Sequence, residues 1–252
     1  MKLDKIGLQL YSVCDSMNNA ENIRDTFKKL KSFGYDVAQT AGCEIPYDEF
    51  GRIAREEGIE ICGTHENLNN LTADPELAMK NHEALGTRII GIGGGAPYPY
   101  NVEKVKKFIE QINIFAATIA PHGFKFTYHN HSDEFRYLEN GKTMMDMLYE
   151  ELDPVNVSFC LDTYWVQHAG ADIRHWIEKL NGRIDILHLK DFIGTNSTTK
   201  ITEIGNGHIW WEGVLESAAN SGVKYYIVEH DEPEDPFKSV KISADYLHRN
   251  FM

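Results

Sequence analysis

Three things are scarce in this 252-residue sequence: cysteine, long apolar runs and basic side chains. The four cysteines, Cys14, Cys43, Cys62 and Cys160, form no C-x-x-C pair, which excludes a disulfide scaffold. We expect four reduced thiols in a cytoplasmic protein. No run of about 18 apolar residues occurs, so we expect no membrane-spanning helix. The N-terminal stretch 1–5 lacks the apolar core of a signal peptide.

The shortage of basic residues restricts the choice of partner. Lys and Arg together number 25, against 38 Asp and Glu, which gives a formal net charge of −13. Proteins that bind nucleic acids neutralise phosphates with basic side chains, so we expect no nucleic-acid partner. The rest of the composition, with 42% hydrophobic and 25% charged residues, is typical of a globular chain and excludes a disordered one.

Short apolar runs alternate with longer helical patterns along the whole chain. The apolar runs predict strands at Ile6–Val13, Tyr35–Ala41, Ile59–His65, Thr87–Gly93, Gly123–His131, Val155–Thr163, Ile184–Lys190 and Val223–His230. The helical patterns predict helices at Glu21–Phe33, Tyr47–Glu57, Asp74–Leu85, Val102–Ala120, Lys142–Glu151, Ala171–Leu180, Trp211–Asn220 and Pro236–Phe251.

Eight strand–helix units follow one another in this pattern. Strands that alternate with helices form parallel sheets through right-handed crossovers. Eight such units in a chain of this length predict a (β/α)8 TIM barrel, formed by a single domain over residues 1–252. The alternative is a doubly wound open sheet. It would require a glycine fingerprint after the first strand, and the segment Tyr11–Asp15 contains no glycine.

Polar residues close several of the predicted strands. Active sites of such barrels lie at the carboxyl ends of the strands, and side chains alternate between the two faces of a strand. Four of these residues can therefore point to one axis at one rim: His129, Asp162, His188 and Glu229. Two imidazoles and two carboxylates suit one divalent ion such as Mn²⁺ or Zn²⁺. The alternative is a hydrogen-bonded polar cluster without a metal.

Three further residues at strand ends are candidates for contact with a substrate. His65 either binds substrate or forms a hydrogen bond that ends its strand. Lys190 either polarises a carbonyl group or holds an anion, unless it only forms an ion pair with Asp191 or Asp162. Trp165 either stacks on a sugar ring or packs in the rim of the barrel.

These strand ends resemble a known superfamily over nearly the whole chain. The matching segments are Tyr128–His131 with Glu134–Phe135, Leu161–Gly170, His188–Asp191, and Ile204–Gly207 with Ile209–Trp211. They are similar to the xylose-isomerase-like TIM barrels, which include sugar phosphate isomerases/epimerases, inosose isomerases and dehydratases, and endonuclease IV. The Tyr-His-Asn-His segment resembles the inosose-dehydratase-like members more than the epimerases.

The resemblance implies one divalent metal held by four strand ends, with the family order Glu, Asp, His, Glu. Asp162, His188 and Glu229 match the last three positions, whereas His129 stands where the family carries its first Glu. In the epimerases the two Glu residues are also an acid/base pair on opposite faces of the substrate. The replacement therefore leads us to expect dehydration or isomerisation rather than symmetric epimerisation. Glu134 is the alternative fourth ligand.

The resemblance also bears on substrate contacts. The epimerases carry a His three residues after the strand-six Asp, and here that position is Trp165. We expect Gln167 and His168 to take over its substrate contacts.

The function expected from the sequence is that of a metal-dependent isomerase or epimerase acting on a keto-sugar or inosose. Glu229 would remove the proton beside a metal-bound carbonyl, and His131 or Glu134 would act as the acid across the site. If the resulting enediolate expels a β-hydroxyl, the enzyme is a dehydratase. Two other classes remain: a nuclease, against which the charge argues, and a non-catalytic sugar-binding subunit. The expected partner is a small sugar or polyol, and assembly into a homo-oligomer is left open.

Overall fold

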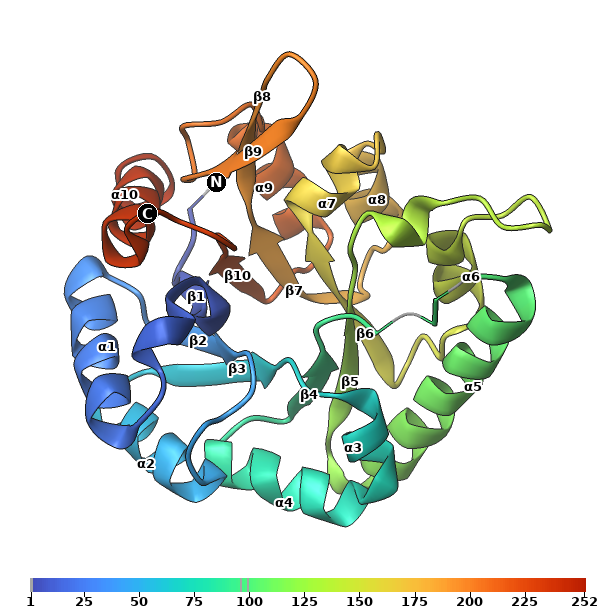
Figure 1. The fold of residues 1–252 in the computed structure, drawn as a ribbon, viewed down its shortest axis with the longest axis horizontal. Helices are drawn as coiled ribbons and strands as arrows, with labels where there is room; N and C mark the ends of the chain where they lie inside the picture. Colours follow the sequence, from blue (N-terminus) through green and yellow to red (C-terminus); the bar gives the residue numbers. More distant parts are fainter. Residues whose placement is uncertain (1, 96, 99) are drawn as a thin grey trace.

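A sheet of eight parallel strands forms the centre of the computed structural model, which describes residues 2–95, 97–98 and 100–252. The strands are β1 (Gly7–Gln9), β2 (Val37–Thr40), β3 (Glu60–Thr64), β4 (Ile89–Ile92), β5 (Lys125–His129), β6 (Val157–Asp162), β7 (Ile184–Leu189) and β10 (Tyr225–Val228). Their order is β3-β2-β1-β10-β7-β6-β5-β4, and a single parallel bridge from Glu66 to Ile92 links the two edge strands. The sheet is therefore a nearly closed barrel (Figure 1).

Among the described residues, eight helices alternate with the barrel strands along the chain and surround the barrel (Figure 1). They are α1 (Ala20–Phe33), α2 (Tyr47–Glu56), α4 (Pro75–Leu85), α5 (Val102–Ile119), α6 (Met144–Glu151), α8 (Ile173–Lys179), α9 (Trp211–Asn220) and α10 (Pro236–Phe251). Most of these helices have a polar residue at the N-cap position. Asn19, Asn101 and Asp235, for example, each accept a hydrogen bond from a backbone N–H of the first turn. The predicted (β/α)8 barrel is confirmed, and the open-sheet alternative is wrong.

The first predicted strand is shorter than expected. It ends at Gln9, and a 3-10 helix, η1 (Leu10–Ser16), follows where the strand was predicted to run on to Val13. The Gln9 side chain causes the change, because its Oε1 accepts a hydrogen bond from the Tyr11 N–H at 3.2 Å. This bond turns the backbone away from the sheet ladder, so the apolar residues of η1 are buried over the rim rather than in the barrel wall.

The connections at the carboxyl ends of the strands contain elements that the apolar periodicity did not predict. These elements are α3 (Leu68–Ala73), α7 (Thr163–His168), the antiparallel pair β8 (Asp191–Gly194) and β9 (Thr199–Thr202), and the 3-10 turn η3 (Asp133–Phe135). A further 3-10 turn, η2 (Ala120–His122), lies at the other end of the barrel, between α5 and β5. Helix α7 begins directly after β6, because the Asp162 Oδ1 atom accepts a hydrogen bond from the Trp165 N–H at 3.0 Å.

A buried carboxylate organises the segment that follows the β8–β9 pair. Asp191 is fully buried and accepts hydrogen bonds from the backbone N–H groups of Phe192, Gly205, Gly207 and Ile209 and from the Trp211 indole N–H. A Cβ atom at Gly207 would lie 2.1 Å from the Asp191 Oδ1 atom, so the position requires glycine. This network fixes the loop between β9 and α9 next to the end of β7.

Inside the barrel, a small apolar cluster fills the space between the strands. It consists of Val37, Cys62, Cys160, Ile186 and Ile227. All four cysteines are free thiols. Within the described part of the chain, no helix combines the length and the apolar character needed to cross a membrane.

Candidate active site

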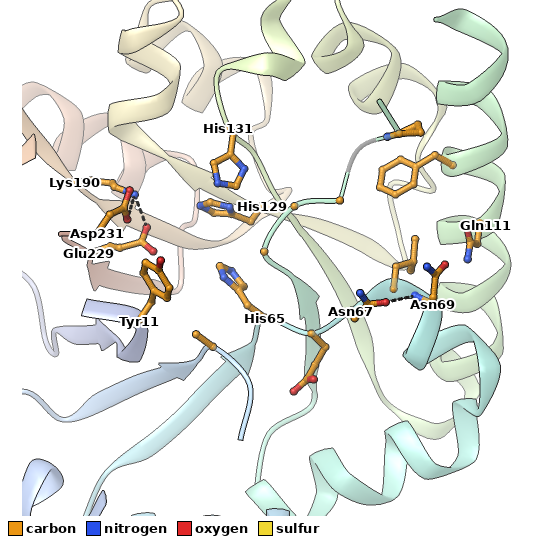
Figure 2. A pocket seen from close by; sticks show the side chains of 18 of the residues that line it. Tyr11, His65, Asn67, Asn69, Gln111, His129, His131, Lys190, Glu229 and Asp231 are labelled. Carbon is orange, nitrogen blue, oxygen red and sulfur yellow. Dashed lines mark hydrogen bonds and ion pairs between the residues drawn. The ribbon is translucent and has the colours of Figure 1, made fainter. Parts of the chain in front are cut away.

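A cavity of about 940 Å³ opens at the carboxyl ends of the strands. Six polar side chains from the strand ends line one part of it: His65, His129, His131, Lys190, Glu229 and Asp231 (Figure 2). The cavity continues past the end of β3 toward the N-terminus of α3 and the side of α5, where Asn67, Asn69 and Gln111 line it (Figure 2). Polar residues converging on a large cleft at this end of a barrel mark it as the candidate active site.

Four ligand-type side chains meet at the floor of the cavity. One ligand atom from each of His129, Asp162, His188 and Glu229 lies within 4.8 Å of those of the other three, and all four residues are buried. The His188 Nδ1 atom lies 2.8 Å from the Glu229 Oε2 atom and 3.8 Å from the Asp162 Oδ2 atom. The sheet register explains the arrangement, because Asp162 and His188 are direct partners in the β6–β7 ladder. The structure thus brings together the four residues expected to share one axis.

Two of these residues carry buried polar atoms that make no hydrogen bond. The Asp162 Oδ2 atom and both ring nitrogens of His129 have no hydrogen-bond partner among the described residues. Buried polar atoms are nearly always paired, so each such atom requires an explanation. The Asp162 Oδ2 and His129 Nε2 atoms lie 3.5 Å apart, and both offer a lone pair when the proton of the neutral His129 ring is on Nδ1. A divalent ion between them would satisfy both atoms, so these residues fit the ion.

The backbone and a buried amide orient the ligand atoms. The Gln39 Oε1 atom lies 2.5 Å from the His188 Nε2 atom and accepts its proton, so the Nδ1 atom is directed at the carboxylates. Asp162 uses Oδ1 to cap α7, which leaves Oδ2 facing the cluster. Its backbone N–H is in turn donated to the Asn130 Oδ1 atom at 3.0 Å. Such outer contacts fix the orientation of metal-binding side chains.

Lys190 supplies a positive charge beside the carboxylates. Its Nζ atom lies 2.6 Å from Asp231 Oδ1, 3.2 Å from Glu229 Oε2 and 3.5 Å from Asp162 Oδ2. Burial opposes a charge on this side chain, but the three carboxylates outweigh the burial and raise the pKa of Lys190. Lys190 therefore carries a buried, charged ammonium group that borders the cavity.

The charge states of the other groups follow from their surroundings. Although burial alone would raise them, Lys190 and the nearby imidazoles hold the pKa values of Asp162 and Glu229 well below the usual range, so both are anions. Burial lowers the pKa of His129 to about 4 and that of His65 well below its usual value, so both rings are neutral at pH 7. Among the four ligand residues, the floor of the cavity thus offers two anionic carboxylates and the neutral ring of His129.

His188 differs from the other imidazoles. Burial opposes its charge, but the neighbouring Cys160 and the Glu229 carboxylate raise its pKa. In the absence of a cation the ring holds a proton toward Glu229, across the 2.8 Å contact. A metal ligand must release such a proton on binding.

The structure separates the candidates near the end of β5. His131 lines the cavity, and its ring centroid lies 4.8 Å from that of His129. Glu134 does not reach the four ligand atoms or the cavity, contrary to both roles expected for it. Its carboxylate accepts hydrogen bonds from the Tyr128 hydroxyl at 2.6 Å and from the His131 N–H at 2.9 Å. Tyr128 points to the outer face of the barrel, and η3 folds Glu134 back onto it.

The candidates on α7 also lie outside the cavity. Trp165 packs against His131, with ring centroids 5.2 Å apart, and does not line the cavity. Gln167 and His168 are exposed, and the His168 Nδ1 atom lies 3.0 Å from the Thr199 hydroxyl of β9. Because α7 starts at Asp162 itself, its second turn points toward the β8–β9 pair. The expected substrate contacts of Gln167 and His168 are therefore absent from this geometry.

Two residues of the site escaped the sequence analysis. Asp231 lies two residues after Glu229. Because side chains of an extended chain alternate between two faces, this spacing places Asp231 on the same face as Glu229, so the sequence could have indicated it. Gln39, near the end of β2, is completely buried, and only the folded chain brings it to His188, 149 residues away. His65 was predicted to contact substrate, and it does line the cavity.

A parallel barrel with polar residues gathered at the carboxyl ends of its strands has the architecture of the barrel enzymes. The chain belongs to the xylose isomerase-like TIM-barrel family, whose model matches residues 27–249. The resemblance seen in the sequence is thereby confirmed. A comparison with curated proteins gives no match.

Solved structures share the fold over nearly the whole chain. A sugar phosphate isomerase/epimerase from Parabacteroides distasonis has a TM-score of 0.84 at 22% identity, over 98% of this chain and 94% of that one. The probable 3-DHS dehydratase AsbF from Bacillus anthracis has a TM-score of 0.77 at 12% identity, over 98% and 99%. The IolI protein with a bound zinc atom has a TM-score of 0.73 at 15% identity, over 97% and 95%.

Proposed function

We propose that the chain is a metal-dependent isomerase or epimerase of a keto-sugar or inosose. The observation that carries this proposal is that two ligand atoms on the floor of a large cavity, Asp162 Oδ2 and His129 Nε2, have no hydrogen-bond partner among the residues that the structure describes. The family is mostly enzymatic, and the structural relatives include an isomerase/epimerase and a protein with bound zinc. One divalent ion, Mn²⁺ or Zn²⁺, held by His129, Asp162, His188 and Glu229, would polarise a substrate carbonyl and its adjacent hydroxyl.

The protein's own groups perform the proton transfers in this proposal. The Glu229 carboxylate is ionised and faces the cavity, so it can accept the proton from the carbon beside the carbonyl. His131 also lines the cavity and is the acid that returns a proton to the substrate. The Lys190 ammonium group stabilises negative charge that develops on the substrate oxygen.

The second candidate reaction is a dehydration. The first step is the same, but His131 then protonates a leaving β-hydroxyl, a C–O bond breaks, and the products are an unsaturated ketone and water. Two observations favour it: His129 occupies the position of the first carboxylate of the epimerases, and a probable dehydratase is among the structural relatives. A non-catalytic sugar-binding subunit would keep the cavity without either reaction.

Solvent exchange tests the proposal. The metal content of the purified protein is measured first, and Mn²⁺ or Zn²⁺ is added to one ion per chain. The protein is then incubated in D₂O with a panel of keto-sugars and inososes, and deuterium incorporation and water loss are followed by NMR. We expect exchange at a carbon beside the carbonyl, and loss of that exchange in Glu229→Gln protein that still binds the metal.

The outcomes separate the alternatives. Exchange without water loss supports the isomerase or epimerase, and exchange with loss of a hydroxyl supports the dehydratase. If the loaded protein binds sugars without exchanging any proton, the enzymatic proposal fails and the binding subunit remains. If Glu229→Gln exchanges as fast as the parent, Glu229 is a ligand only and another residue is the base.

A further inference from the structure

A second group of ligand atoms, the lower group, adjoins the four strand-end residues and extends one position further into the barrel at Cys160. Ligand atoms of His65, Cys160 and His188 all lie within 4.8 Å of one another. Cys160 precedes Asp162 by two residues on β6, so its thiol points to the same barrel interior one step below. The two groups share His188 and no other residue.

Two members of this lower group, His65 and Cys160, have a free or weakly engaged ligand atom. The His65 Nε2 atom is buried and has no hydrogen-bond partner among the described residues, while its Nδ1 atom lies 3.2 Å from the Gln9 amide. The Cys160 thiol is fully buried, and its two contacts with the Gln39 side chain are long, 3.9 Å to Nε2 and 4.0 Å to Oε1. The Gln39 carbonyl oxygen, 2.5 Å from His188, adds a fourth donor atom to the group.

His188 presents a different nitrogen to each group. Its Nδ1 atom faces Glu229 and Asp162, and its Nε2 atom faces Gln39, which also contacts Cys160. A neutral imidazole has one nitrogen with a free lone pair, and the other nitrogen carries a proton. Each nitrogen already has an acceptor for that proton, the Glu229 carboxylate at Nδ1 and the Gln39 carbonyl at Nε2. His188 can therefore serve either group without moving its ring.

We propose that His65, Cys160 and His188, with the Gln39 carbonyl, form a second site for a thiophilic divalent ion such as Cd²⁺ or Zn²⁺, and that it alternates with the upper site. Thiolate and imidazole ligands favour soft and borderline ions, whereas the carboxylates above suit Mn²⁺. Binding in the lower site releases two protons to solvent, one from the Cys160 thiol and one from His188 Nε2, and keeps the His188 proton on Nδ1, toward Glu229. The upper group then lacks its His188 ligand, so a thiophilic ion displaces Mn²⁺ without touching its carboxylates.

Cadmium titration of the full-length, metal-free protein tests the site. Cd²⁺ bound to a thiolate gives a charge-transfer absorption in the ultraviolet that carboxylate and imidazole ligands do not give. We expect this band to rise to a plateau at one Cd²⁺ per chain and to be lost in Cys160→Val. The matched control is Cys62→Val, because Cys62 lies in the same interior cluster but outside the ligand group. Circular dichroism shows whether each variant is folded.

Competition with Mn²⁺ tests the alternation. We follow free Mn²⁺ by electron paramagnetic resonance while Cd²⁺ is added to the Mn²⁺-loaded protein. We expect release of Mn²⁺ in parallel with the thiolate band in the parent and in Cys62→Val. In Cys160→Val the Cd²⁺ concentration for half-release should rise by at least about tenfold, the effect that even an outer-shell contact commonly has.

The failure of this inference differs from the failure of the proposed function. If Cd²⁺ binds without a thiolate band, or if Cys62→Val loses the band as Cys160→Val does, the lower site is disproved while the upper site stands. If the band forms but Mn²⁺ stays bound, the two sites do not share His188 and the alternation is disproved. If Mn²⁺ never binds but the thiolate band forms, the proposed enzymatic site fails and the lower one survives.

Discussion

Asp162 divides its two carboxylate oxygens between structure and chemistry. Oδ1 caps α7, and Oδ2 faces the ligand cluster without a hydrogen-bond partner. Asn caps helices as well as Asp does, whereas Ala does not. The two functions of this one side chain can therefore be separated by substitution.

We predict that Asp162→Asn weakens Mn²⁺ binding by at least about tenfold and leaves α7 intact. Asp162→Ala should weaken binding similarly and cost about 1 kcal/mol more in the free energy of unfolding, because the helix cap is lost. Calorimetric Mn²⁺ titration and urea unfolding of both variants measure the two effects. Parent-like Mn²⁺ affinity in Asp162→Asn would show that Oδ2 is not a ligand.

A second buried histidine affects stability rather than the site. His82 on α4 is completely enclosed, donates from Nδ1 to the Ala78 carbonyl and accepts at Nε2 from the Thr64 hydroxyl. Burial lowers the pKa of His82 to about 4. In the unfolded chain the ring takes up a proton near its ordinary pKa of about 6.5, whereas the folded chain resists protonation until about pH 4.

The unfolded state therefore binds more protons than the folded state between these two pH values, and acid favours unfolding. We predict that His82 alone removes about 2 kcal/mol of unfolding free energy between pH 7 and pH 5. Urea unfolding of the parent and of His82→Gln at both pH values gives the difference. Equal pH dependence in the two proteins would contradict the prediction, and the other buried histidines cancel in the comparison.

At the scale of elements, hydrophobic periodicity predicts the barrel but not its rim. Apolar runs located all eight barrel strands, and the alternation of side chains placed His129 and His188 on a common face. The start of α7 and the loop between β9 and α9 depend instead on single polar side chains, Asp162 and Asp191, that bind backbone N–H groups. The sequence alone does not show which backbone N–H or C=O group a polar side chain will bind in the folded protein. For this reason Glu134, Gln167 and His168 were expected in the site and lie outside the cavity.

Asp191 is the most heavily bonded of these side chains, and its substitution should loosen a whole element. In the parent, several N–H groups donate to the Asp191 carboxylate. In Asp191→Asn one carboxylate oxygen is replaced by an NH₂ group, which is itself a donor and cannot accept these hydrogen bonds. We predict a loss of about 2–3 kcal/mol of unfolding free energy and faster hydrogen exchange at Gly205 and Gly207. The matched control is Asp172→Asn, which keeps its cap of α8 and should change stability by less than about 0.5 kcal/mol. Equal losses in the two variants would contradict the role given to Asp191.

At the scale of the whole molecule, the barrel wall is unevenly bonded. The ladders β5–β6, β6–β7 and β7–β10 are each paired over four positions, and they carry the ligand cluster. Between β3 and β4 the backbone contact is the Glu66 N–H donated to the Gly91 carbonyl at 2.8 Å. The Gly91 N–H bonds instead to the Thr64 side chain. The β1–β10 ladder is also short, with two paired positions, but among the described residues the β3–β4 seam, beside His65, is the most weakly bonded part of the barrel wall.

We predict that hydrogen exchange in the native protein is fastest, among the barrel strands, at this seam. The amides of Glu66 and Gly91 should exchange at least about tenfold faster than those of Leu161 and His188, because local opening requires breaking fewer hydrogen bonds there. Exchange followed by NMR or mass spectrometry at a pH where the protein is stable measures the ratio. Uniform protection around the barrel would show that side-chain packing closes the seam as firmly as a backbone ladder does.

The uneven wall has a consequence for how this scaffold can diversify. The stiff arc holds the reactive groups, and the weakly bonded arc, with His65 and Asn67, borders the cavity on the side that extends toward α5 (Figure 2). Substitutions along the weak arc can reshape the space for new ligands while the reactive arc keeps its geometry. In the proposed function, recognition and reactivity thus occupy separately mutable parts of one barrel, an arrangement that allows a change of specificity without rebuilding the chemistry.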